Sequence, residues 1–442
     1  MLTVAYLANQ FPCAVEPYVI EEIGELRRRG ARVIVGSARR AEDQVLEIRY
    51  RPEIVLQPLR AIILVRAVFL CMRRWRAIAP LLARIFFRGR EGPFKRVKAL
   101  AHTWMGGCYA VLLQERGVNH IHVHHGYFGS WIAMVAARLL DVEFSVTLHG
   151  SDLLLHGTYL DVKLESCALC LTVSEYNRNF VLQHYPAVEA EKVVVARLGV
   201  EVAENAAPVV KTNRDPLNLL AVGRLHEVKD HAFLVRACAQ LRDRNVYFEC
   251  LIAGEGPERR NLEKLIRKCG LEKQVALLGQ VARDDMTALY DRADVVVLTS
   301  RSEGIPLVLM EAMARGKIVL APAITGIPEL VIAGKTGFLY EPGSAAEFVD
   351  RLESIRSLMI QSSVIRPSMI WPPMRAQNDP EQRSRLSSEV RQLEWIQHAA
   401  RVQVRLNFNQ SRNLELFGDV FLERVAPQTE SIPHEDLVLQ QI

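Results

Sequence analysis

The amino-acid sequence predicts an α/β protein with two doubly wound parallel-sheet domains in tandem and a ligand-binding cleft between them. Three observations lead to this prediction. Short apolar segments rich in β-branched residues alternate with segments of helical periodicity along most of the chain. The alternation stops at a polar stretch, residues 201–216, and then starts again. The length of 442 residues also exceeds one ordinary hydrophobic core, so two domains of about 200 residues each are expected.

The first domain is expected to cover residues 1–200. Its candidate strands are residues 3–9, 31–37, 120–125, 144–150, 169–174 and 192–199. Between the first two strands lies the segment PYVIEEIGELRRRG, which is apolar at helical spacing and stopped by Gly30. This order is a βαβ unit, and its nearly continuous apolar strands indicate a parallel sheet that is covered on both faces.

The second domain is expected to cover residues 217–400, after a linker at 201–216. Its candidate strands are residues 217–224, 247–254, 274–281, 293–300, 317–322 and 337–342. Residues 357–400 are atypical, because they contain prolines and methionines and lack a sustained period. Residues 389–425 are helical again, with a C-terminal helix at 401–425, and residues 426–442 form a tail.

The composition is that of a soluble globular protein. Half of the residues are hydrophobic and 24% are charged. The formal charge of +5 is too small to indicate nucleic-acid binding, but it suits an anionic substrate or an anionic membrane face. The eight cysteines are scattered, mostly within apolar segments, which predicts free thiols in a reducing compartment.

The first residues, MLTVAYLANQF, have neither a basic region nor a small-residue cleavage site. They are therefore expected to form a strand and not a signal peptide. A membrane-spanning helix is not expected either, because Arg66 interrupts the apolar run AIILVRAVFLCM. The predicted location is the cytoplasm.

A basic stretch stands out at residues 60–98. It contains eleven Arg and Lys residues against one acid, Glu91, and they alternate with aliphatic and aromatic residues. This combination is typical of helices that lie on an anionic membrane surface, so contact with the inner membrane face is predicted. The alternative is a pair of ordinary helices with solvated basic faces.

The segment AVGRLHEVKD (221–230) places cations at a strand-to-helix turn. A strand ends at Gly223, Arg224 follows, and Lys229 opens the next helical segment. Two cations and the backbone N–H groups of a helix start suit a pyrophosphate, although two surface cations on a loop would look the same. In the following turn, LIAGEGPERRNLEKL, Gly254 and Gly256 lack the third glycine of a dinucleotide motif. We therefore interpret it as a closely packed turn.

The segment SRSEGIPLVLMEAMARGK (300–317) contains two glutamates. Pro306 is suited to the first turn of a helix that Gly316 ends, so Glu303 is expected in a loop and Glu311 within the helix. This arrangement does not flank one bond as a hydrolase pair does. The two carboxylates suit hydroxyl groups of a sugar or ribose, and the helix start between them suits a phosphate. The alternative is one acid that favours the helix dipole and one surface glutamate.

Polar residues also follow a predicted strand of the first domain. In TLHGSD (147–152), His149, Gly150 and Asp152 lie where site residues of parallel sheets are found, although His149 could equally be a core histidine. The segment HIHVHH (120–125) places three histidines on one strand face and the fourth on the other. No metal site is predicted there, because no carboxylate stands at ligand spacing, and no D-x-D occurs in the chain.

Taken together, these motifs resemble glycosyltransferase family 4, the retaining nucleotide-sugar transferases of the GT-B fold. The segments that carry the resemblance are EPYVIEEIGELRRRG, TLHGSDL, AVGRLHEVKD, IAGEGPERRNLE, LGQV and the block from ADVVVLTSRSEG to GFLYEPGS. They follow the family's order over residues 3–350. The glutamates eight positions apart, with GIPEL after them, are the most specific part. The stretch HVHHGYFGSWIAMVAARLLDVEFSVTLHGSDL is similar to members of the colanic-acid type that build bacterial exopolysaccharides.

The resemblance implies a GT-B fold with two Rossmann-like domains, and it implies a role for each motif residue. Arg224 and Lys229 would bind the donor diphosphate and stabilise its charge as it leaves. Glu311 would hold the ribose, and Glu303 would hold hydroxyls of the donor sugar. His149 would lie beside the sugar and the reacting centre.

Further positions follow from the same resemblance. The implied catalytic residues are His149, Arg224, Lys229 and Glu303. The implied donor-binding residues are Gly223, Arg224, Lys229, Gly254, Leu278, Gly279, Glu303, Gly304, Ile305, Pro306, Leu307 and Glu311, with the backbone at Leu278 and Gly279 receiving the base. The implied acceptor-side residues are Glu16, Gly150 and Asp152.

The implied reaction is metal-independent transfer, with retention of configuration, from a UDP- or GDP-sugar to a glycan or lipid-linked acceptor. No cofactor is expected. The helix at 401–425 would cross back to the first domain. Three features depart from the family: the N-terminal loop NQFPCAVEPY lacks a double glycine, Lys317 replaces a small residue, and residues 357–400 do not match. A non-catalytic nucleotide-sugar-binding subunit of a polysaccharide assembly complex and a nucleotide-sugar isomerase are the alternatives.

Overall fold

The computed structural model describes most of the chain as two units. The described residues are 1–13, 16–39, 51–88, 91–155, 157–202, 216–370 and 380–426, with only the backbone for those between 361 and 391. The first unit comprises Met1–Thr147, Thr158–Cys170 and Glu415–Ile442, and the second comprises Leu148–Gly157 and Leu171–Leu414. The predicted linker lies outside the described residues except for 201, 202 and 216, and so does the predicted tail except for 426. The predicted domain boundaries stay predictions.

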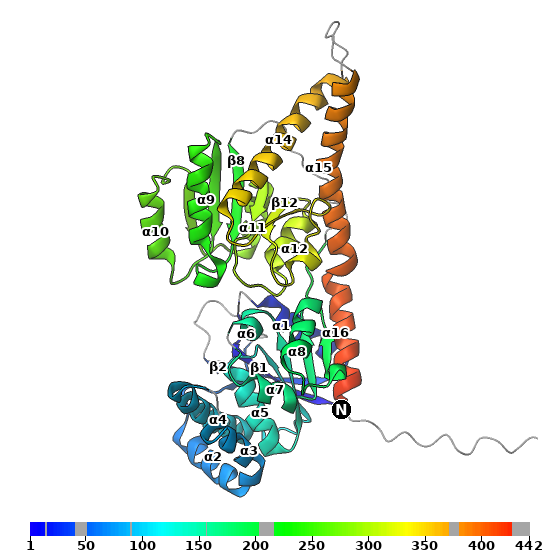
Figure 1. The fold of residues 1–442 in the computed structure, drawn as a ribbon. Coiled ribbons are helices and arrows are strands. Elements are labelled where there is room, and N and C mark those ends of the chain that lie inside the picture. Colours follow the sequence, from blue (N-terminus) through cyan, green and yellow to red (C-terminus); the bar gives the residue numbers. More distant parts are fainter. Residues whose placement is uncertain are drawn as a thin grey trace, which may run out of the picture. The chain divides into compact units, whose positions relative to one another are not determined.

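A seven-stranded sheet is built from the N-terminal half of the chain (Figure 1). Its strands are β1 (Thr3–Gln10), β2 (Arg32–Arg39), β3 (Ile54–Val55), β4 (His120–His124), β5 (Glu143–Leu148), β6 (Leu169–Thr172) and β7 (Val193–Val195). The order β3-β2-β1-β4-β5-β6-β7 reverses direction between β1 and β4, which is the switch point where such sheets bind ligands. The pairs β1–β2, β1–β4, β2–β3 and β4–β5 are parallel, as predicted.

Helices accompany these strands. They are α1 (Pro17–Arg28), α2 (Ala61–Arg73), α3 (Trp75–Phe86), α4 (Pro93–Leu113), α5 (Phe128–Leu140), α6 (Ser151–Leu154), α7 (Leu160–Ser166) and α8 (Glu175–His184). In α1, Pro17 occupies the first turn, and Arg27 and Arg28 in the last turn favour the helix dipole. The helix ends before Gly30, whose φ of 86° suits glycine, so the predicted helix and its stop are confirmed.

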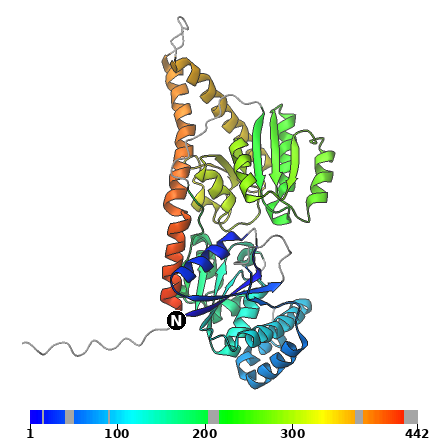
Figure 2. The ribbon, with the colours of Figure 1, turned by 180° about the vertical axis from the view of Figure 1, so that it is seen from behind.

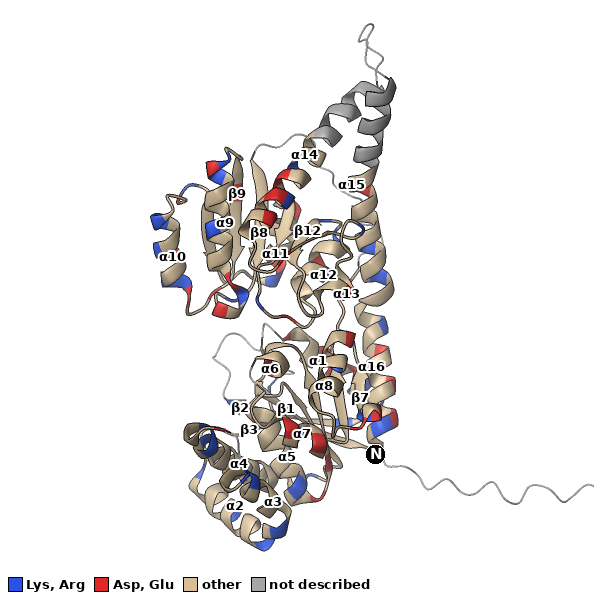
Figure 3. Cartoon of the chain, viewed as in Figure 1, with Lys and Arg blue, Asp and Glu red and all other residues tan. Residues whose placement is uncertain are grey.

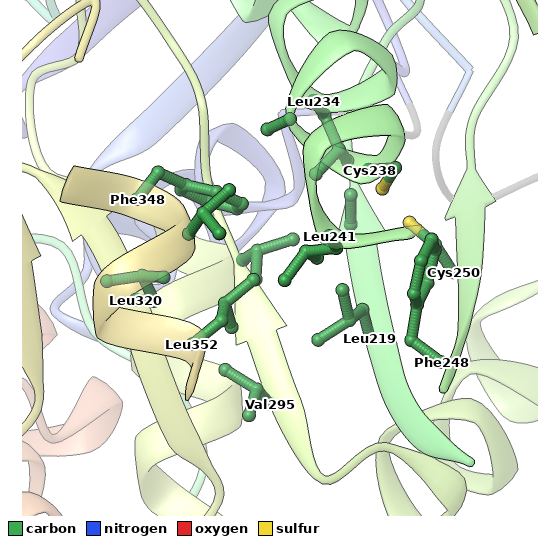
Figure 4. Packing of buried hydrophobic residues seen from close by; sticks show 14 of the residues in the cluster. Leu219, Leu234, Cys238, Leu241, Phe248, Cys250, Val295, Leu320, Phe348 and Leu352 are labelled. Carbon is green, nitrogen blue, oxygen red and sulfur yellow. The ribbon is translucent and has the colours of Figure 1, made fainter. Parts of the chain in front are cut away.

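A six-stranded sheet is built from the C-terminal half, in the order β10-β9-β8-β11-β12-β13. Its strands are β8 (Leu217–Val222), β9 (Phe248–Ala253), β10 (Val275–Gly279), β11 (Val295–Val297), β12 (Ile318–Pro322) and β13 (Phe338–Tyr340). All pairs are parallel, so the predicted doubly wound class is confirmed. Figure 4 shows the core on one face of this sheet, where Leu219 and Phe248 of the strands meet Leu234 and Phe348 of the helices.

The helices of the second half include two long ones near the C-terminus (Figures 1 and 2). The helices are α9 (His231–Asp243), α10 (Arg259–Lys268), α11 (Arg283–Arg292), α12 (Leu307–Ala314), α13 (Ile327–Leu330), α14 (Ala345–Ile370), α15 (Pro380–Asn407) and α16 (Gln410–Val425), and the short 3₁₀ turns are η2 (Ala190–Lys192) and η3 (Glu227–Lys229). Residues 357–370 and 380–388 are therefore helical, although the sequence lacks a sustained period there, and the predicted helical structure from residue 389 onward is confirmed. Leu352 of α14 and Leu393 and Ile396 of α15 join the same buried cluster.

The last turns of α16 belong to the first unit. Arg29 donates hydrogen bonds to the Asp419 carboxylate at 2.5 Å and to the Glu415 carbonyl at 2.7 Å. The Phe421 ring lies edge-on to the His122 ring, with centroids 5.1 Å apart. A terminal helix segment thus completes the packing of the first sheet.

All eight cysteines are free, and five of them are buried. This agrees with the prediction of unpaired thiols inside apolar segments. Cys238 and Cys250 lie near each other in the core that Figure 4 shows. The hydrogen bond with Cys250, together with burial, raises the pKa of the Cys238 thiol, which keeps it protonated. These thiols therefore serve as small core residues.

Candidate functional site

The turn after β8 brings a lysine and a glutamate together. The chain leaves the strand at Gly223, passes the exposed Arg224 and forms η3, which ends at Lys229. Lys229 Nζ lies 2.5 Å from Glu303 Oε1, and the two side chains are only 24% and 12% exposed. Arg224 has no ion-pair partner among the described residues. The turn therefore carries one neutralised cation and one available cation.

The loop that contains Glu303 is fixed beside this turn by side-chain hydrogen bonds. The Thr299 hydroxyl donates to the Lys229 carbonyl at 3.0 Å, and the Thr325 hydroxyl donates to the Glu303 carbonyl at 2.6 Å. The Arg301 guanidinium donates to the Asp230 carboxylate at 2.8 Å. These contacts hold residues distant in sequence against the neighbouring strands β8 and β11. Thr325 was not predicted, because no motif marks it.

Glycines allow three strand ends to meet. Gly254 follows β9 with φ of 152°, and a Cβ atom there would lie 1.9 Å from the Gly223 carbonyl oxygen. The Gly254 N–H donates to the Gly279 carbonyl at 2.8 Å, which joins the end of β9 to the end of β10. Gly279 itself has φ of 76°, and the Leu278 side chain beside it is 39% exposed. Any side chain at Gly254 would separate these strand ends, as the interpretation of a closely packed turn requires.

Helix α12 positions the second glutamate. Pro306 precedes its first residue, Leu307, and no side chain caps the helix start. Glu311 lies in the second turn, where its carboxylate accepts a hydrogen bond of 2.6 Å from the Tyr290 hydroxyl. The helix stops before Gly316, which has φ of 67°. The loop position of Glu303 and the helical position of Glu311 are thus as predicted.

Tyr290 of α11 is a site residue that the sequence did not reveal. Its ring is buried, and Arg315 lies over the ring with Cζ 5.0 Å from the centroid. Burial and the Glu311 carboxylate raise the pKa of the Tyr290 hydroxyl, so the phenol stays a hydrogen-bond donor. Tyr290 therefore fixes one oxygen of Glu311 and leaves the other available for a ligand.

His149 and Gly150 form a tight turn within the second unit. The Gly150 N–H donates to Asp152 Oδ1 at 2.7 Å, and the His149 N–H donates to the same carboxylate at 3.2 Å. The Asn177 amide donates to the His149 carbonyl at 2.9 Å. A Cβ atom at Gly304 would lie 1.8 Å from that carbonyl, so a glycine is needed there. The turn therefore packs against the loop that contains Glu303, and the buried Asp152 carboxylate stabilises the turn by accepting hydrogen bonds from its backbone.

Three other polar groups near these loops were not predicted. The hydroxyls of Ser300 and Ser302 are buried, and neither has a hydrogen-bond partner among the described residues. Buried polar groups without partners are rare in native proteins and often lie where a ligand binds. His231 is the first residue of α9, and its ring lies next to the backbone of Gly223. Burial lowers the pKa of the His231 ring to about 4, so the ring is neutral at neutral pH.

Glu16 lies in the first unit, beside the end of β4. Its Oε1 is 3.0 Å from Nε2 of His125, a residue with φ of 70°. Lys317, which departs from the resembled family, is buried and donates to the carbonyls of Asp291 and Ala293 at 3.0 and 3.3 Å. These carbonyls solvate the buried ammonium, so Lys317 supports the second sheet.

A buried polar cluster occupies the first unit. Ligand atoms of Glu22, His122 and His124 lie within 4.8 Å of one another. The Tyr6 hydroxyl donates to the Glu22 carboxylate, which lies 3.1 Å from His124 Nε2. His122 bonds to the hydroxyls of Ser145 and Thr147 at 2.7 and 3.2 Å. The three residue types could ligate a metal ion, but protein hydrogen bonds already engage each side chain.

This cluster contains a carboxylate that the sequence pattern does not place beside the histidines. No carboxylate stands at ligand spacing along the sequence, but α1 brings Glu22 to the histidines from about one hundred positions earlier. Burial lowers the pKa of His122 well below its usual value, so its ring stays neutral. A hydrogen-bonded core cluster therefore describes the observed contacts better than a metal centre does.

Comparisons with known proteins agree with this geometry. Residues 203–361 match the model of the family described as "Glycosyl transferases group 1". The "Putative colanic acid biosynthesis glycosyltransferase WcaL" of Escherichia coli is 38% identical over 174 residues, or 38% of this chain and 43% of that protein. The "D-inositol 3-phosphate glycosyltransferase" of Pseudarthrobacter chlorophenolicus is 32% identical over 280 residues, or 60% of this chain and 64% of that protein. The chain thus matches less than two thirds of the length of these curated relatives.

A solved structure covers nearly the whole fold. The Anabaena protein Alr3699/HepE in complex with UDP superposes with a TM-score of 0.63, covering 96% of this chain and 100% of that one, at 18% identity. The two parallel sheets and the loops at their strand ends define a protein of the GT-B class. Residues 203–361 are thus similar to the glycosyl transferases group 1 family. The resemblance and the fold predicted from the sequence are confirmed.

Proposed function

We propose that the protein is a retaining glycosyltransferase that moves a sugar from a nucleotide-diphosphate donor to a glycan or lipid-linked acceptor. The observation that carries the proposal is the Lys229–Glu303 pair beside the exposed Arg224. Cations next to a glycine turn at strand ends bind diphosphates, and a carboxylate held beside them accepts hydrogen bonds from sugar hydroxyls. UDP is the proposed nucleotide, because the similar Anabaena structure contains UDP.

The geometry assigns a part to each group. Lys229 moves from Glu303 to the diphosphate, and Arg224 offers a planar guanidinium to the same oxygens. Glu303 then accepts hydrogen bonds from the donor sugar, and the free oxygen of Glu311 accepts them from the ribose. The uncapped start of α12 adds backbone N–H groups directed at negative charge.

The proposed reaction uses these charges in one displacement on a single face of the sugar. The acceptor hydroxyl oxygen bonds to the anomeric carbon, the bond from that carbon to the diphosphate oxygen breaks, and the acceptor proton passes to the leaving phosphate. Charge grows on the diphosphate as the bond breaks, so Lys229 and Arg224 lower the barrier most at that moment. Neither a metal nor a cofactor is part of this proposal.

Polysaccharide assembly is the proposed pathway class. The similar Escherichia coli protein is named for colanic acid, and the "Amylovoran biosynthesis glycosyltransferase AmsK" of Erwinia amylovora is 35% identical over 237 residues. Both names refer to exported polysaccharides. We therefore place the reaction at the cytoplasmic face of the membrane, where lipid-linked acceptors for such polymers would be presented.

A donor screen tests the proposal. UDP at about one hundred times its Kd should stabilise the protein by about 2.7 kcal/mol and raise the melting temperature, with GDP giving a smaller rise. Labelled UDP-sugars and a membrane extract should then yield a labelled lipid product. Binding without transfer would favour a non-catalytic subunit, and rearrangement without acceptor would favour an isomerase. If neither nucleotide shifts the melting temperature, the donor site is wrongly assigned.

The basic stretch has the surface that a membrane-bound acceptor would need. Figure 3 shows Lys and Arg residues along α2, α3 and α4. Their large exposed apolar side chains are Ile62, Val65, Val68, Phe69, Met72, Trp75, Phe86, Phe87, Phe94, Val97 and Trp104. Among the described residues, no helix has the length and apolar composition needed to cross a membrane. We infer that these helices lie on an anionic membrane surface. Arg90 of this stretch is outside the described residues.

Vesicle binding tests this surface. Replacing Arg73, Arg74 and Arg76 together by serine should weaken binding to phosphatidylglycerol vesicles by about 3 kcal/mol, or about a hundredfold, because each cation near the surface contributes about 1 kcal/mol. The matched control replaces three exposed cations of α10, namely Arg260, Arg267 and Lys268, and should sediment with vesicles as the wild type does. Equal sedimentation of both triple variants would exclude the helices as the membrane face.

A further inference from the structure

A second group of cations gathers at the carboxyl edge of the first sheet. Arg39 is the last residue of β2, and its Cζ lies 5.3 Å from the centroid of the Phe128 ring at the start of α5. The His102 ring of α4 contacts the same ring, with centroids 5.3 Å apart. Lys98 precedes His102 by one helical turn on the same face of α4. Residues of three different elements thus meet around one aromatic ring.

These cations are not balanced by carboxylates among the described residues. Arg39 and Lys98 are exposed, and neither forms an ion pair there. Two other arginines of the first unit are paired by contrast: Arg84 lies 3.0 Å from Glu91, and Arg29 lies 2.5 Å from Asp419. Among the described residues, no carboxylate pairs with Arg39 or Lys98. Clustered cations without acids attract an anionic ligand.

A buried lysine strengthens the positive field. Lys163 is only 3% exposed, and its ammonium donates to the carbonyls of Gly126 and Tyr127 at 2.7 and 2.9 Å. The field is visible at His102, whose pKa falls to about 4 through burial first and then through Lys163, Lys98 and Arg39. His102 is therefore neutral at neutral pH and keeps one ring N–H as a hydrogen-bond donor.

The location suits a ligand of the acceptor side. Doubly wound sheets bind ligands outside the carboxyl ends of their strands near the switch point, which here lies between β1 and β4. Arg39 ends the strand next to β1, and α5 follows β4. The donor phosphates already have Arg224 and Lys229 in the second unit. A separate set of cations in the first unit therefore points to a second phosphate-bearing ligand.

Helix α4 links these cations to the proposed membrane surface. Its first turns expose Phe94 and Val97, and Lys98 lies with Nζ 4.4 Å from the centroid of the Phe94 ring. His102 follows one turn later and is half-buried. The same helix thus begins with apolar side chains suited to lipid and continues with cations suited to phosphate.

We propose that Arg39, Lys98 and His102 bind the phosphate or pyrophosphate that joins an acceptor sugar to its lipid. This proposal rests on the proposed function for the existence of such an acceptor. The Arg39 guanidinium offers paired N–H donors, Lys98 adds a point charge, and His102 adds a neutral N–H. Contacts with the Phe128 ring position the side chains of Arg39 and His102. The buried Lys163 adds a further positive charge nearby.

Binding of inorganic pyrophosphate tests the site without any need for turnover. The His102 ring signal, identified by its loss in His102→Gln, should shift on titration with pyrophosphate, and the pKa of His102 should rise because an anion stabilises the imidazolium. Arg39→Ala and Lys98→Ala should each weaken this response about tenfold, as expected for a lost charge-assisted hydrogen bond. The matched controls are Arg32→Ala, at the opposite end of β2, and Lys95→Ala on α4, and both should respond as the wild type does.

Three further measurements separate the phosphate sources. The Arg39→Ala variant should bind UDP and phosphatidylglycerol vesicles normally, but its KM for a lipid-pyrophosphate acceptor should rise about tenfold with kcat retained. An acceptor that carries the same sugar without phosphate should show no such difference. The proposed site would be overturned if the His102 ring signal did not shift on titration with pyrophosphate. Equal shifts of this signal in the Arg39→Ala and Arg32→Ala variants would overturn it as well. Absence of all transfer would instead count against the proposed function, because the pyrophosphate titration is independent of it.

Discussion

Replacing Lys229 by alanine is expected to lower kcat by about a hundredfold to a thousandfold, the usual effect of removing one group that stabilises developing charge. The Lys229 ammonium lies at the turn after β8 beside Glu303, and in the proposed function it binds the diphosphate as it leaves. Its absence also leaves the Glu303 carboxylate without its counterion. The measurement is transfer from UDP-sugar under single-turnover conditions, with UDP affinity determined on the same sample.

A second variant makes this prediction sharper. Glu303→Gln should also lower kcat, because an amide accepts hydrogen bonds from sugar hydroxyls less well than a carboxylate. The variant should nevertheless bind UDP at least as tightly as the wild type, because no ion pair between Lys229 and residue 303 has to break before Lys229 can bind the diphosphate. Lys268→Ala, an exposed lysine of α10, is the control and should change neither quantity. Loss of UDP affinity in both site variants to the same degree would contradict the proposed exchange of partners.

Gly254→Ala is expected to destabilise the second unit by about 3 kcal/mol or more, because strain and overpacking each contribute about 1–3 kcal/mol. The new methyl group would meet the Gly223 carbonyl oxygen at 1.9 Å, and the φ of 152° is nearly closed to alanine. The ends of β8 and β9 would have to separate, so UDP binding should be lost as well. Denaturant unfolding gives the change in free energy.

The matched control for this substitution is Gly343→Ala. Gly343 also has a positive φ, 81°, but a Cβ atom there would meet nothing within 4 Å. Backbone strain alone should therefore cost about 1 kcal/mol, and UDP binding should persist. Similar losses for the two variants would show that the close approach to Gly223 does not matter.

The sequence predicted strands better than it predicted the connections between them. Apolar runs bounded by glycine and polar residues marked twelve strands, since a buried parallel strand has little choice of composition. Strand β3 was missed because its two residues carry no period. Helices α14 and α15 run into residues 357–400, where the apolar positions do not repeat regularly enough to indicate a helix.

The candidate site was predictable only where a motif is continuous. The segments around Lys229 and Glu303 were recognised separately, and their pairing across 74 positions depends on β8 and β11 being neighbours in the sheet. Tyr290 and Thr325 were not predicted, because each acts on a site residue through a single hydrogen bond. Glu22 was missed for a related reason, since only the packing of α1 brings its carboxylate to the histidines of β4.

The ion pair between Lys229 and Glu303 also determines which small molecules can compete for the site. A carboxylate held by an ammonium at 2.5 Å is a weak acceptor for hydroxyl groups. A free monosaccharide has no charge with which to draw the lysine away, so it meets an occupied carboxylate. In the proposed function, a nucleotide-linked sugar brings the diphosphate that draws Lys229 away from Glu303 and then presents its hydroxyls to that carboxylate. The proposed function therefore makes recognition of the sugar conditional on the phosphate, and we expect that unactivated sugar does not inhibit transfer.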